Sequence, residues 1–156
     1  MNKLMFVDVD GVLNNRATLS AGTSCWLLDP NCLLLLKDIV DKTGAKIVIS
    51  STWRCFEKGL VTLKQHFRKH NIPNWIGCTE DLNNKSGPWS SGNHINRSEE
   101  ISKWILDNNV DQDNDRIAII DDDIDACLVP KWFFHTSFNE GLTREVAGDI
   151  ITHLNA

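Results

Sequence analysis

The sequence predicts an α/β fold, in which a mostly parallel five-stranded sheet is covered by helices on both faces. Short apolar runs that suit buried strands recur at residues 4–7, 45–49 and 117–120. Segments with helical spacing of apolar residues lie between these runs, and such alternation is typical of a parallel sheet. A chain of 156 residues that is 42% hydrophobic is long enough for a proper core, so we expect one domain over residues 1–156.

The composition excludes some functional classes. The net charge of −5 argues against a broad surface that tracks duplex phosphates, although it permits binding of a nucleotide or a strand end. The apolar runs are too short to cross a bilayer, and no signal peptide is apparent. The 5 cysteines include no Cys-x-x-Cys pair, which is typical of reduced thiols. We therefore expect a cytoplasmic protein without a membrane partner.

The first elements follow from the apolar pattern and from helix signals. Residues 4–7 predict a buried strand, and residues 14–29 predict a polar loop with room for a short turn or hairpin. Asp29 as N-cap and Pro30 at the first helical position predict the start of a helix. Gly44 is a suitable residue to end it.

The middle of the chain repeats the pattern. Residues 45–49 predict a second strand, and residues 57–70 suit a helix with one apolar face. A short third strand is expected over residues 75–78. Residues 80–93 are rich in Asn, Ser and Gly and predict an irregular loop, which at that length is often functional.

The last third supplies the remaining elements. A helix is expected to start at Ser98, and residues 116–120 predict a fourth strand. Residues 132–134 suit a fifth strand. Thr143 is the expected N-cap of a final helix that runs to about Leu154. No internal repeat or domain linker is visible.

Chemically active side chains follow three of the predicted strands. They are Asp8 and Asp10, Ser50 and Ser51, and Asp121 and Asp122. Right-handed crossovers bring the carboxyl ends of parallel strands to one edge of the sheet, where ligands bind. An unpaired buried carboxylate is very costly, so we expect these acids to lie in a cleft, with Gly11 turning the backbone beside them.

The residue types at this edge predict a phosphoryl site. Oxygen ligands without histidine or thiolate suit Mg²⁺. Arg97, at a helix start, adds a cation for a dianionic group. The expected chemistry is covalent: Asp8 attacks phosphorus to give an aspartyl phosphate, and Asp10 protonates the leaving oxygen before it activates water.

The order of these motifs resembles the haloacid dehalogenase (HAD) superfamily of phosphatases. Asp8-Val9-Asp10-Gly11-Val12 is similar to its motif I, Ser50 to motif II, Arg97 to motif III, and Asp121-Asp122 to the paired acids of motif IV. The segments that begin at Ser50, Arg97 and Gly141 resemble a small branch found with RNA-repair enzymes, akin to the phosphatase half of polynucleotide kinase-phosphatases.

The resemblance implies a three-layer Rossmann-like fold, a Mg²⁺ cofactor and a role for each motif residue. Asp8 would be nucleophile and metal ligand, and Asp10 would be general acid/base and bind metal through its backbone carbonyl. Asp122 would be the main motif IV ligand, supported by Asp121. Ser50 and Arg97 would hold the phosphoryl group.

Several assignments stay open in the sequence. Ser51 is an alternative to Ser50 as phosphate ligand, and Lys103 is an alternative to Arg97 as the motif III cation. Asp125 suits either support of the metal ligands or a solvated helix start, and Asp123 is a further acid outside the family pattern.

Other side chains near the expected cleft are weaker candidates. Arg54 suits either substrate binding or a surface ion pair. Trp53 is expected in the core rather than stacked on a base, and Trp89 in the polar loop is a better stacking candidate. Arg16 and Lys85 add positive charge that favours an anionic substrate.

The leading hypothesis is a phosphomonoesterase that acts on a nucleotide or a nucleic-acid end. The intervals 14–29 and 75–96 are too short for an inserted cap domain, and a nearly capless site admits a polymer end more easily. Alternatives are a phosphatase of a small metabolite or phosphoprotein and, more distantly, a receiver-like phospho-acceptor module. The sequence does not indicate the oligomeric state.

Overall fold

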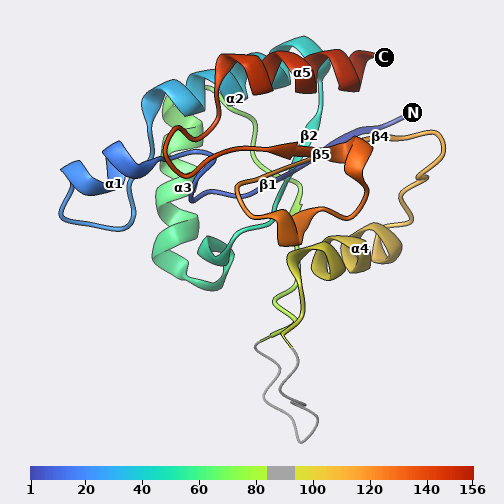
Figure 1. Ribbon diagram of the computed structural model, residues 1–156, viewed down its shortest axis with the longest axis horizontal. Helices are drawn as coiled ribbons and strands as arrows, with labels where there is room; N and C mark the ends of the chain where they lie inside the picture. Colours follow the sequence, from blue (N-terminus) through green and yellow to red (C-terminus); the bar gives the residue numbers. More distant parts are fainter. Residues whose placement is uncertain (84–93) are drawn as a thin grey trace, which may run out of the picture.

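The computed structural model describes residues 1–83 and 94–156, and it confirms the parallel α/β architecture (Figure 1). The sheet has 5 strands in the order β3-β2-β1-β4-β5, and every neighbouring pair is parallel. The strands are β1 (Lys3–Val7), β2 (Lys46–Ile49), β3 (Gly77–Cys78), β4 (Arg116–Asp121) and β5 (Phe133–His135).

The central strand β1 brings the predicted motifs together. Val7 is aligned with Ile49 of β2 on one side and with Ile120 of β4 on the other. The backbone pairing continues one step further, because the Asp8 N–H donates to Ile120 O (3.0 Å) and the Ser50 N–H donates to Val7 O (2.9 Å). The residues that follow β1, β2 and β4 therefore lie side by side at the carboxyl edge of the sheet.

Helices cover both faces of the sheet, which gives three layers (Figure 1). Residues of α2 (Pro30–Thr43), α3 (Glu57–Lys69) and α5 (Arg144–Asn155) pack on one face, and α4 (Arg97–Asp107) packs on the other. The connections contain α1 (Arg16–Ala21) and the short 3₁₀ helices η1 (Thr52–Cys55), η2 (Ile124–Ala126) and η3 (Pro130–Trp132). Within the described ranges, no helix is long and apolar enough to span a membrane.

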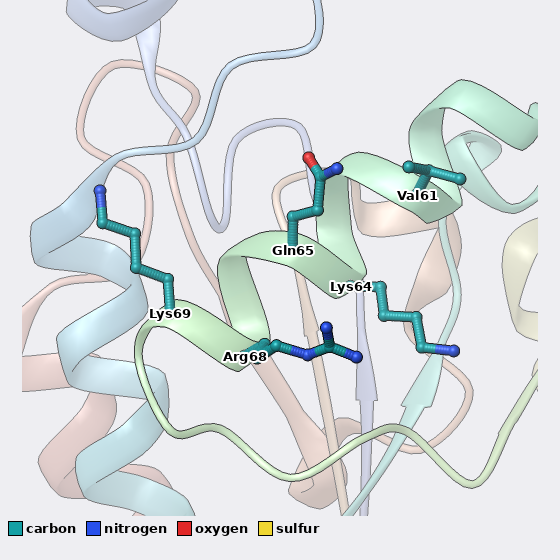
Figure 2. A pocket seen from close by; sticks show the side chains of 5 residues that line it. All are labelled: Val61, Lys64, Gln65, Arg68 and Lys69. Atoms are coloured by element: carbon teal, nitrogen blue, oxygen red, sulfur yellow. The ribbon is translucent and has the colours of Figure 1, made fainter.

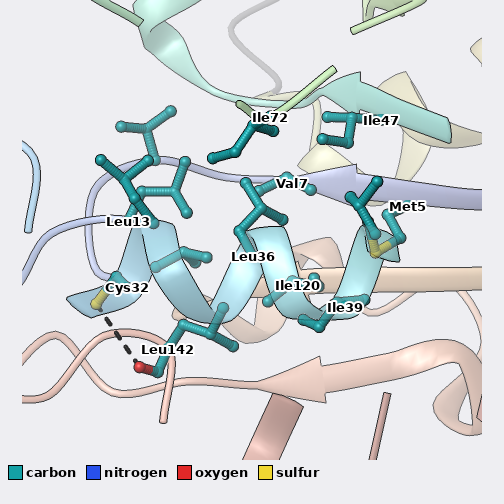
Figure 3. Close-up of a cluster of buried hydrophobic side chains, with 14 of the residues drawn as sticks. Met5, Val7, Leu13, Cys32, Leu36, Ile39, Ile47, Ile72, Ile120 and Leu142 are labelled. Atoms are coloured by element: carbon teal, nitrogen blue, oxygen red, sulfur yellow. Dashed lines mark hydrogen bonds between the residues drawn. The ribbon is translucent and has the colours of Figure 1, made fainter. Parts of the chain in front are cut away.

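Alternation along the strands divides the core in two. Met5 and Val7 of β1 face α2, α3 and α5, whereas Phe6 faces α4, as the side-chain period of 2 in a strand requires. Figure 3 shows α2 laid along the first of these clusters. The Cys32 thiol there donates to the Leu142 backbone carbonyl (3.6 Å), so this cysteine is core filling rather than a reactive group.

The helix-end signals act as predicted. The Asp29 side chain accepts from the Asn31 N–H (2.7 Å), and Pro30 is the first residue of α2. Gly44 ends that helix in the left-handed conformation (φ 69°). The Thr143 hydroxyl accepts from the Val146 N–H (3.3 Å) at the start of α5.

The segment 14–29 differs from its prediction, because it contains the helix α1 rather than a turn or hairpin. None of the α1 residues is buried, so the helix left no apolar periodicity in the sequence. Its N-cap Asn15 accepts from the Thr18 N–H (3.0 Å) and donates to Asp29 Oδ2 (2.8 Å). Polar caps therefore hold this helix and join its start to the start of α2.

The helix α4 begins at Arg97, one residue before the predicted Ser98. A capping box explains the shift, because the Glu99 side chain accepts from the Asn96 N–H (2.9 Å) and Asn96 is the N-cap. This start places Arg97 on the first turn, next to the carboxyl edge of the sheet.

Candidate active site

Three carboxylates from two adjacent strands converge at the carboxyl edge. Asp8, Asp121 and Asp122 each have an oxygen atom within 4.8 Å of the other two. Asp8 and Asp121 are buried, and Asp122 is partly exposed. Hard oxygen donors in this number, open to solvent on one side, fit the coordination that Mg²⁺ prefers, with water filling the remaining positions.

Gly11 is required by the close packing of this cluster. Its φ of 76° is in the left-handed region, and a Cβ atom there would lie 2.4 Å from Asp122 Oδ2. The Thr136 hydroxyl donates to Gly11 O (2.7 Å), and His135 Nε2 donates to Asp122 O (2.9 Å). The end of β5 therefore fixes both the turn after β1 and the backbone of Asp122.

The electrostatics of the cluster favour a bound cation. Burial and the neighbouring Asp121 raise the pKa of Asp8 well above its usual value, and the Arg97 guanidinium opposes this. Burial raises the pKa of Asp121 to about 7, against the opposing hydrogen bond from the Asp123 N–H. Burial also raises the pKa of Asp122. A divalent ion would offset the repulsion between these acids and let them all ionise.

Asp10 lies beside the cluster with one carboxylate oxygen fixed. Asp10 Oδ1 accepts from Asn14 Nδ2 (2.8 Å) and from Trp53 Nε1 (3.1 Å). Asn14 is fully buried, and its Oδ1 accepts from the Gly11 N–H (2.9 Å). Sequence reasoning missed Asn14. The available signal was an amide directly after Val12 and Leu13, in a turn next to an acid pair.

The two serines after β2 have different surroundings. The Ser50 hydroxyl is buried and has no hydrogen-bond partner among the described residues. The Ser51 hydroxyl accepts from the Trp53 N–H (3.2 Å), so it caps η1. An unpaired buried hydroxyl is unfavourable unless a ligand or water completes it, and Ser50 stands next to Asp8.

Arg97 points from the first turn of α4 toward Ser50. Its Nη1 donates to the Ser50 backbone carbonyl, and its Nε lies 3.7 Å from Glu100 Oε2. Lys103, further along α4, forms ion pairs with Glu80 (3.2 Å) and with Asp107. Arg97 therefore lies at the carboxyl edge, whereas Lys103 is held in ion pairs on the surface of α4.

Arg54 forms a buried ion pair rather than a surface one. Its Nη2 lies 2.8 Å from Glu100 Oε2, and both side chains are almost fully buried. Its Nε donates to Thr79 O (2.7 Å), and its Nη1 donates to Ser51 O (2.6 Å). Arg54 therefore ties η1, the end of β3 and α4 together at the edge of the candidate site.

A hollow of about 120 Å³ adjoins Arg97 and continues the cleft away from the acids. Most residues of its wall have polar side chains, and they come from η1, from the residues after β3, from the start of α4 and from η2. The lining residues are Thr52, Arg54, Cys55, Asp81, Asn83, His94, Ile95, Arg97, Glu100 and Asp125. Arg97 lines this hollow and also reaches the Ser50 carbonyl at the carboxyl edge.

The remaining candidates lie at the margins. The exposed Asp123 caps η2 by accepting from the Asp125 N–H (3.0 Å). Asp125 Oδ2 lies 4.0 Å from His94 Nε2. Trp53 is buried, and Arg16 is exposed at the start of α1. Lys85 and Trp89 lie outside the described residues.

A second hollow, of about 340 Å³, lies along α3 (Figure 2). Val61, Lys64, Gln65, Arg68 and Lys69 line it, and all five come from that one helix. Their side chains fan outward instead of converging on a point. None of the carboxyl-edge acids lines it, so we place the chemistry at the sheet edge and regard this hollow as a solvated basic face.

Comparisons with known proteins identify the family of the chain. Searches of curated proteins and of solved structures returned no match. The family described as "HAD domain in Swiss Army Knife RNA repair proteins" matches residues 4–147, a range that holds every motif residue at the carboxyl edge. The chain belongs to this family of HAD domains.

Proposed function

We propose that this protein is a Mg²⁺-dependent phosphomonoesterase that acts through an aspartyl phosphate on a terminal phosphate of a nucleotide or nucleic acid. The observation that carries the proposal is one juxtaposition. The carboxylate of Asp8 lies between the acids Asp121 and Asp122 on one side and, on the other, the Ser50 hydroxyl, which has no hydrogen-bond partner in residues 1–83 and 94–156. This juxtaposition supports a site in which metal ligands, nucleophile and phosphoryl ligand would act together.

The cluster supplies the metal ligands. The carboxylates of Asp8, Asp121 and Asp122 would hold Mg²⁺, together with the backbone carbonyl of Asp10. When bound, the ion would supply charge neutralisation for the phosphoryl group and for the attacking carboxylate. Asp123 and Asp125 fit a supporting role, because their described contacts are to η2 and to the start of α4.

Four side chains are assigned to the phosphoryl group and its support. Ser50 offers its free hydroxyl, and Arg97 offers its guanidinium beside Ser50. Ser51 and Arg54 support the fold of the site instead of binding the phosphoryl group, because the Ser51 hydroxyl caps η1 and the Arg54 guanidinium is paired with Glu100. We therefore favour Ser50 over Ser51, and Arg97 over Lys103, as direct ligands.

The reaction has two balanced steps. Asp8 attacks phosphorus while the bond to the leaving oxygen breaks and Asp10 gives its proton to that oxygen. Asp8 is then an acyl phosphate, a mixed anhydride of its carboxylate and phosphate, and Asp10 is ionised. Asp10 next takes a proton from water, whose oxygen attacks phosphorus and breaks the bond to Asp8, so that phosphate leaves and Asp10 is protonated again.

The substrate class rests on the family and on the open cleft. The family is one of RNA repair proteins, and the polar hollow beside Arg97 offers room for the nucleotide that carries the phosphate. A small-metabolite or phosphoprotein phosphatase would use the same acids and remains the second candidate. A receiver-like module is disfavoured, because Thr79, not an aspartate, directly follows β3.

The test is phosphate release from a panel of 3′- and 5′-phosphorylated oligonucleotides, mononucleotides, a small sugar phosphate and an aryl phosphate, with Mg²⁺ or with EDTA. We expect Mg²⁺-dependent release that prefers one kind of oligonucleotide end, and no release by Asp8→Asn. Release from small esters alone would support the metabolite phosphatase. No release from any ester would overturn the proposed activity.

A further inference from the structure

We infer that Asn14 and Trp53 are positioning residues for Asp10, and that they adapt the site to phosphate esters whose leaving group is a sugar alkoxide. This inference rests on the proposed function, because it concerns the proton that Asp10 delivers. It assigns a role to two uncharged side chains whose N–H groups donate to the Asp10 carboxylate.

The geometry distinguishes the two oxygens of Asp10. Oδ1 accepts two N–H groups, from Asn14 (2.8 Å) and from Trp53 (3.1 Å). No hydrogen bond to Oδ2 is formed by residues 1–83 or 94–156. A carboxyl oxygen that accepts two N–H donors cannot also carry the acid proton toward them, so the proton of the acid form belongs on Oδ2. Oδ2 is therefore the atom that serves the leaving oxygen and, later, the water.

The side-chain amide of Asn14 cannot flip by 180° without losing its hydrogen bonds. It is fully buried, and its Oδ1 already accepts from the Gly11 N–H (2.9 Å). Its Nδ2 is shared between Asp10 Oδ1 and the Leu27 backbone carbonyl (3.0 Å). With oxygen and nitrogen both committed, the amide presents N–H to Asp10 in only one orientation.

Trp53 is held as firmly from a different segment. Its indole is buried and meets the Trp26 ring edge to face, with the ring centroids 5.0 Å apart. Trp26 approaches α3 at Gly59, where a Cβ atom would lie 2.8 Å from the Trp26 ring. Two donors fixed by separate parts of the fold therefore converge on one oxygen, which removes the rotation of the Asp10 carboxyl.

Such fixation matters for one class of leaving group. A sugar alkoxide is strongly basic and needs a proton as its bond to phosphorus breaks, whereas a nitrophenolate leaves readily without one. The arrangement thus contributes to the departure of a sugar alkoxide, including the one at a nucleotide end, and contributes little to the departure of an activated aryl group. This difference gives the inference a readout that general damage to the fold would not produce.

The experiment compares Trp53→Phe with wild type on two substrates, a 3′- or 5′-phosphorylated oligonucleotide and p-nitrophenyl phosphate. Phenylalanine keeps an aromatic ring and removes the N–H donor. We expect kcat/KM on the oligonucleotide, which reports the steps up to departure of the leaving group, to fall about tenfold or more, since proton transfer contributes about 10²–10⁴ in such steps. On p-nitrophenyl phosphate we expect a change in kcat/KM below about twofold, because its leaving group needs no proton.

Trp132→Phe is the matched control, because Trp132 is similarly buried but packs with Phe6 in the cluster on the α4 face. It should change neither rate. The thermal stabilisation of Trp53→Phe by Mg²⁺ should equal that of wild type, which separates a positioning role from loss of the metal site. If Trp53→Phe does not fold, 3-benzothienylalanine at position 53 retains both rings and removes the same N–H.

The outcomes separate this inference from the proposed function. Equal losses on both substrates, or no loss on either, in an otherwise active enzyme would overturn the positioning role alone. A wild-type protein that hydrolyses neither ester would overturn the proposed function and this inference together. Asn14→Ala should repeat the selective loss on the oligonucleotide if it folds.

Discussion

At the scale of single residues, the candidate site depends on a few atoms that have no freedom to move. Gly11 is the sharpest case, because its backbone is left-handed and the Asp122 carboxylate occupies the space of a side chain. Ser50 is the opposite case, because its buried hydroxyl has no partner among the described residues. Gly11 permits the close packing of the acid cluster by lacking a side chain, and Ser50 has a hydroxyl that is available to a ligand.

Gly11→Ala tests the first of these, with Gly44→Ala as a matched control. Both glycines are left-handed (φ 76° and 69°), but a Cβ at Gly44 meets nothing within 4 Å. Each substitution should lower the free energy of unfolding by about 1 kcal/mol through backbone strain. Only Gly11→Ala should also displace Asp122 and weaken the stabilisation by Mg²⁺, measured as the shift in Tm. Equal Mg²⁺ shifts in both variants would contradict this account of Gly11.

Ser50→Ala and Ser51→Ala should separate activity from stability. Removing the unpartnered Ser50 hydroxyl should leave the free energy of unfolding unchanged or slightly raised, because no hydrogen bond is lost. It should lower kcat/KM by about tenfold or more, the worth of one hydrogen bond to a charged group. Ser51→Ala should instead cost about 1 kcal/mol of stability, through loss of the η1 cap. The reverse pattern would make Ser51 the phosphoryl ligand.

At the scale of elements, the approach of α4 to the sheet edge sets the position of Arg97. Glu100 of α4 joins three partners: it pairs with Arg54 (2.8 Å), approaches Arg97 (3.7 Å) and accepts from the Leu82 N–H (3.0 Å). In the sequence, Glu100 lies two residues after the helix start predicted at Ser98. Its burial follows from tertiary packing that no local pattern reports.

Glu100→Gln should therefore be costly, whereas Lys103→Gln should not. Loss of the Glu100 charge leaves Arg54 buried without a counter-ion, which typically costs about 3–5 kcal/mol. Lys103 makes exposed pairs, and its removal should leave urea unfolding and phosphate release unchanged. A loss of activity in Lys103→Gln with normal stability would return Lys103 to the phosphoryl site.

The elements themselves were predictable to different degrees. β1, β2 and β4 were predicted together with the active residues that follow them, because buried parallel strands have continuous apolar sequences and right-handed crossovers bring their ends together. α1 was missed because it buries no residue. Asn14 was missed because its role depends on the geometry of a turn. The Trp53 N–H was missed because its partner, Asp10, lies 43 residues away in the chain. Periodicity encodes neither feature.

At the scale of the whole molecule, the raised pKa values of the acid cluster couple folding to pH. Burial raises the pKa of Asp121 from 3.8 to about 7, and that of Asp8 also lies well above its usual value. Between about pH 4 and pH 7, Asp121 of the metal-free folded protein keeps a proton that the unfolded chain has released. The stability of the metal-free protein must therefore fall as pH rises over this range.

We expect the contribution of Asp121 to the Tm in EDTA to fall between about pH 4 and pH 7. The Tm shift produced by Mg²⁺ should grow over the same range. Asp121→Asn removes the titrating group. Without metal it should be more stable than wild type near pH 8, and the difference should shrink toward pH 4. An identical pH dependence of Tm in both proteins would show that Asp121 is not the group responsible.

The most direct test of the central claim is to locate the phosphoryl group during turnover. The enzyme is mixed with a phosphorylated oligonucleotide and Mg²⁺, quenched in acid and reduced with borohydride, which converts an aspartyl phosphate to homoserine. Peptide mass spectrometry then reads the modified position. The account predicts modification at residue 8, and none there in Asp8→Asn. Phosphate release with modification at another acid, or with none, would contradict it.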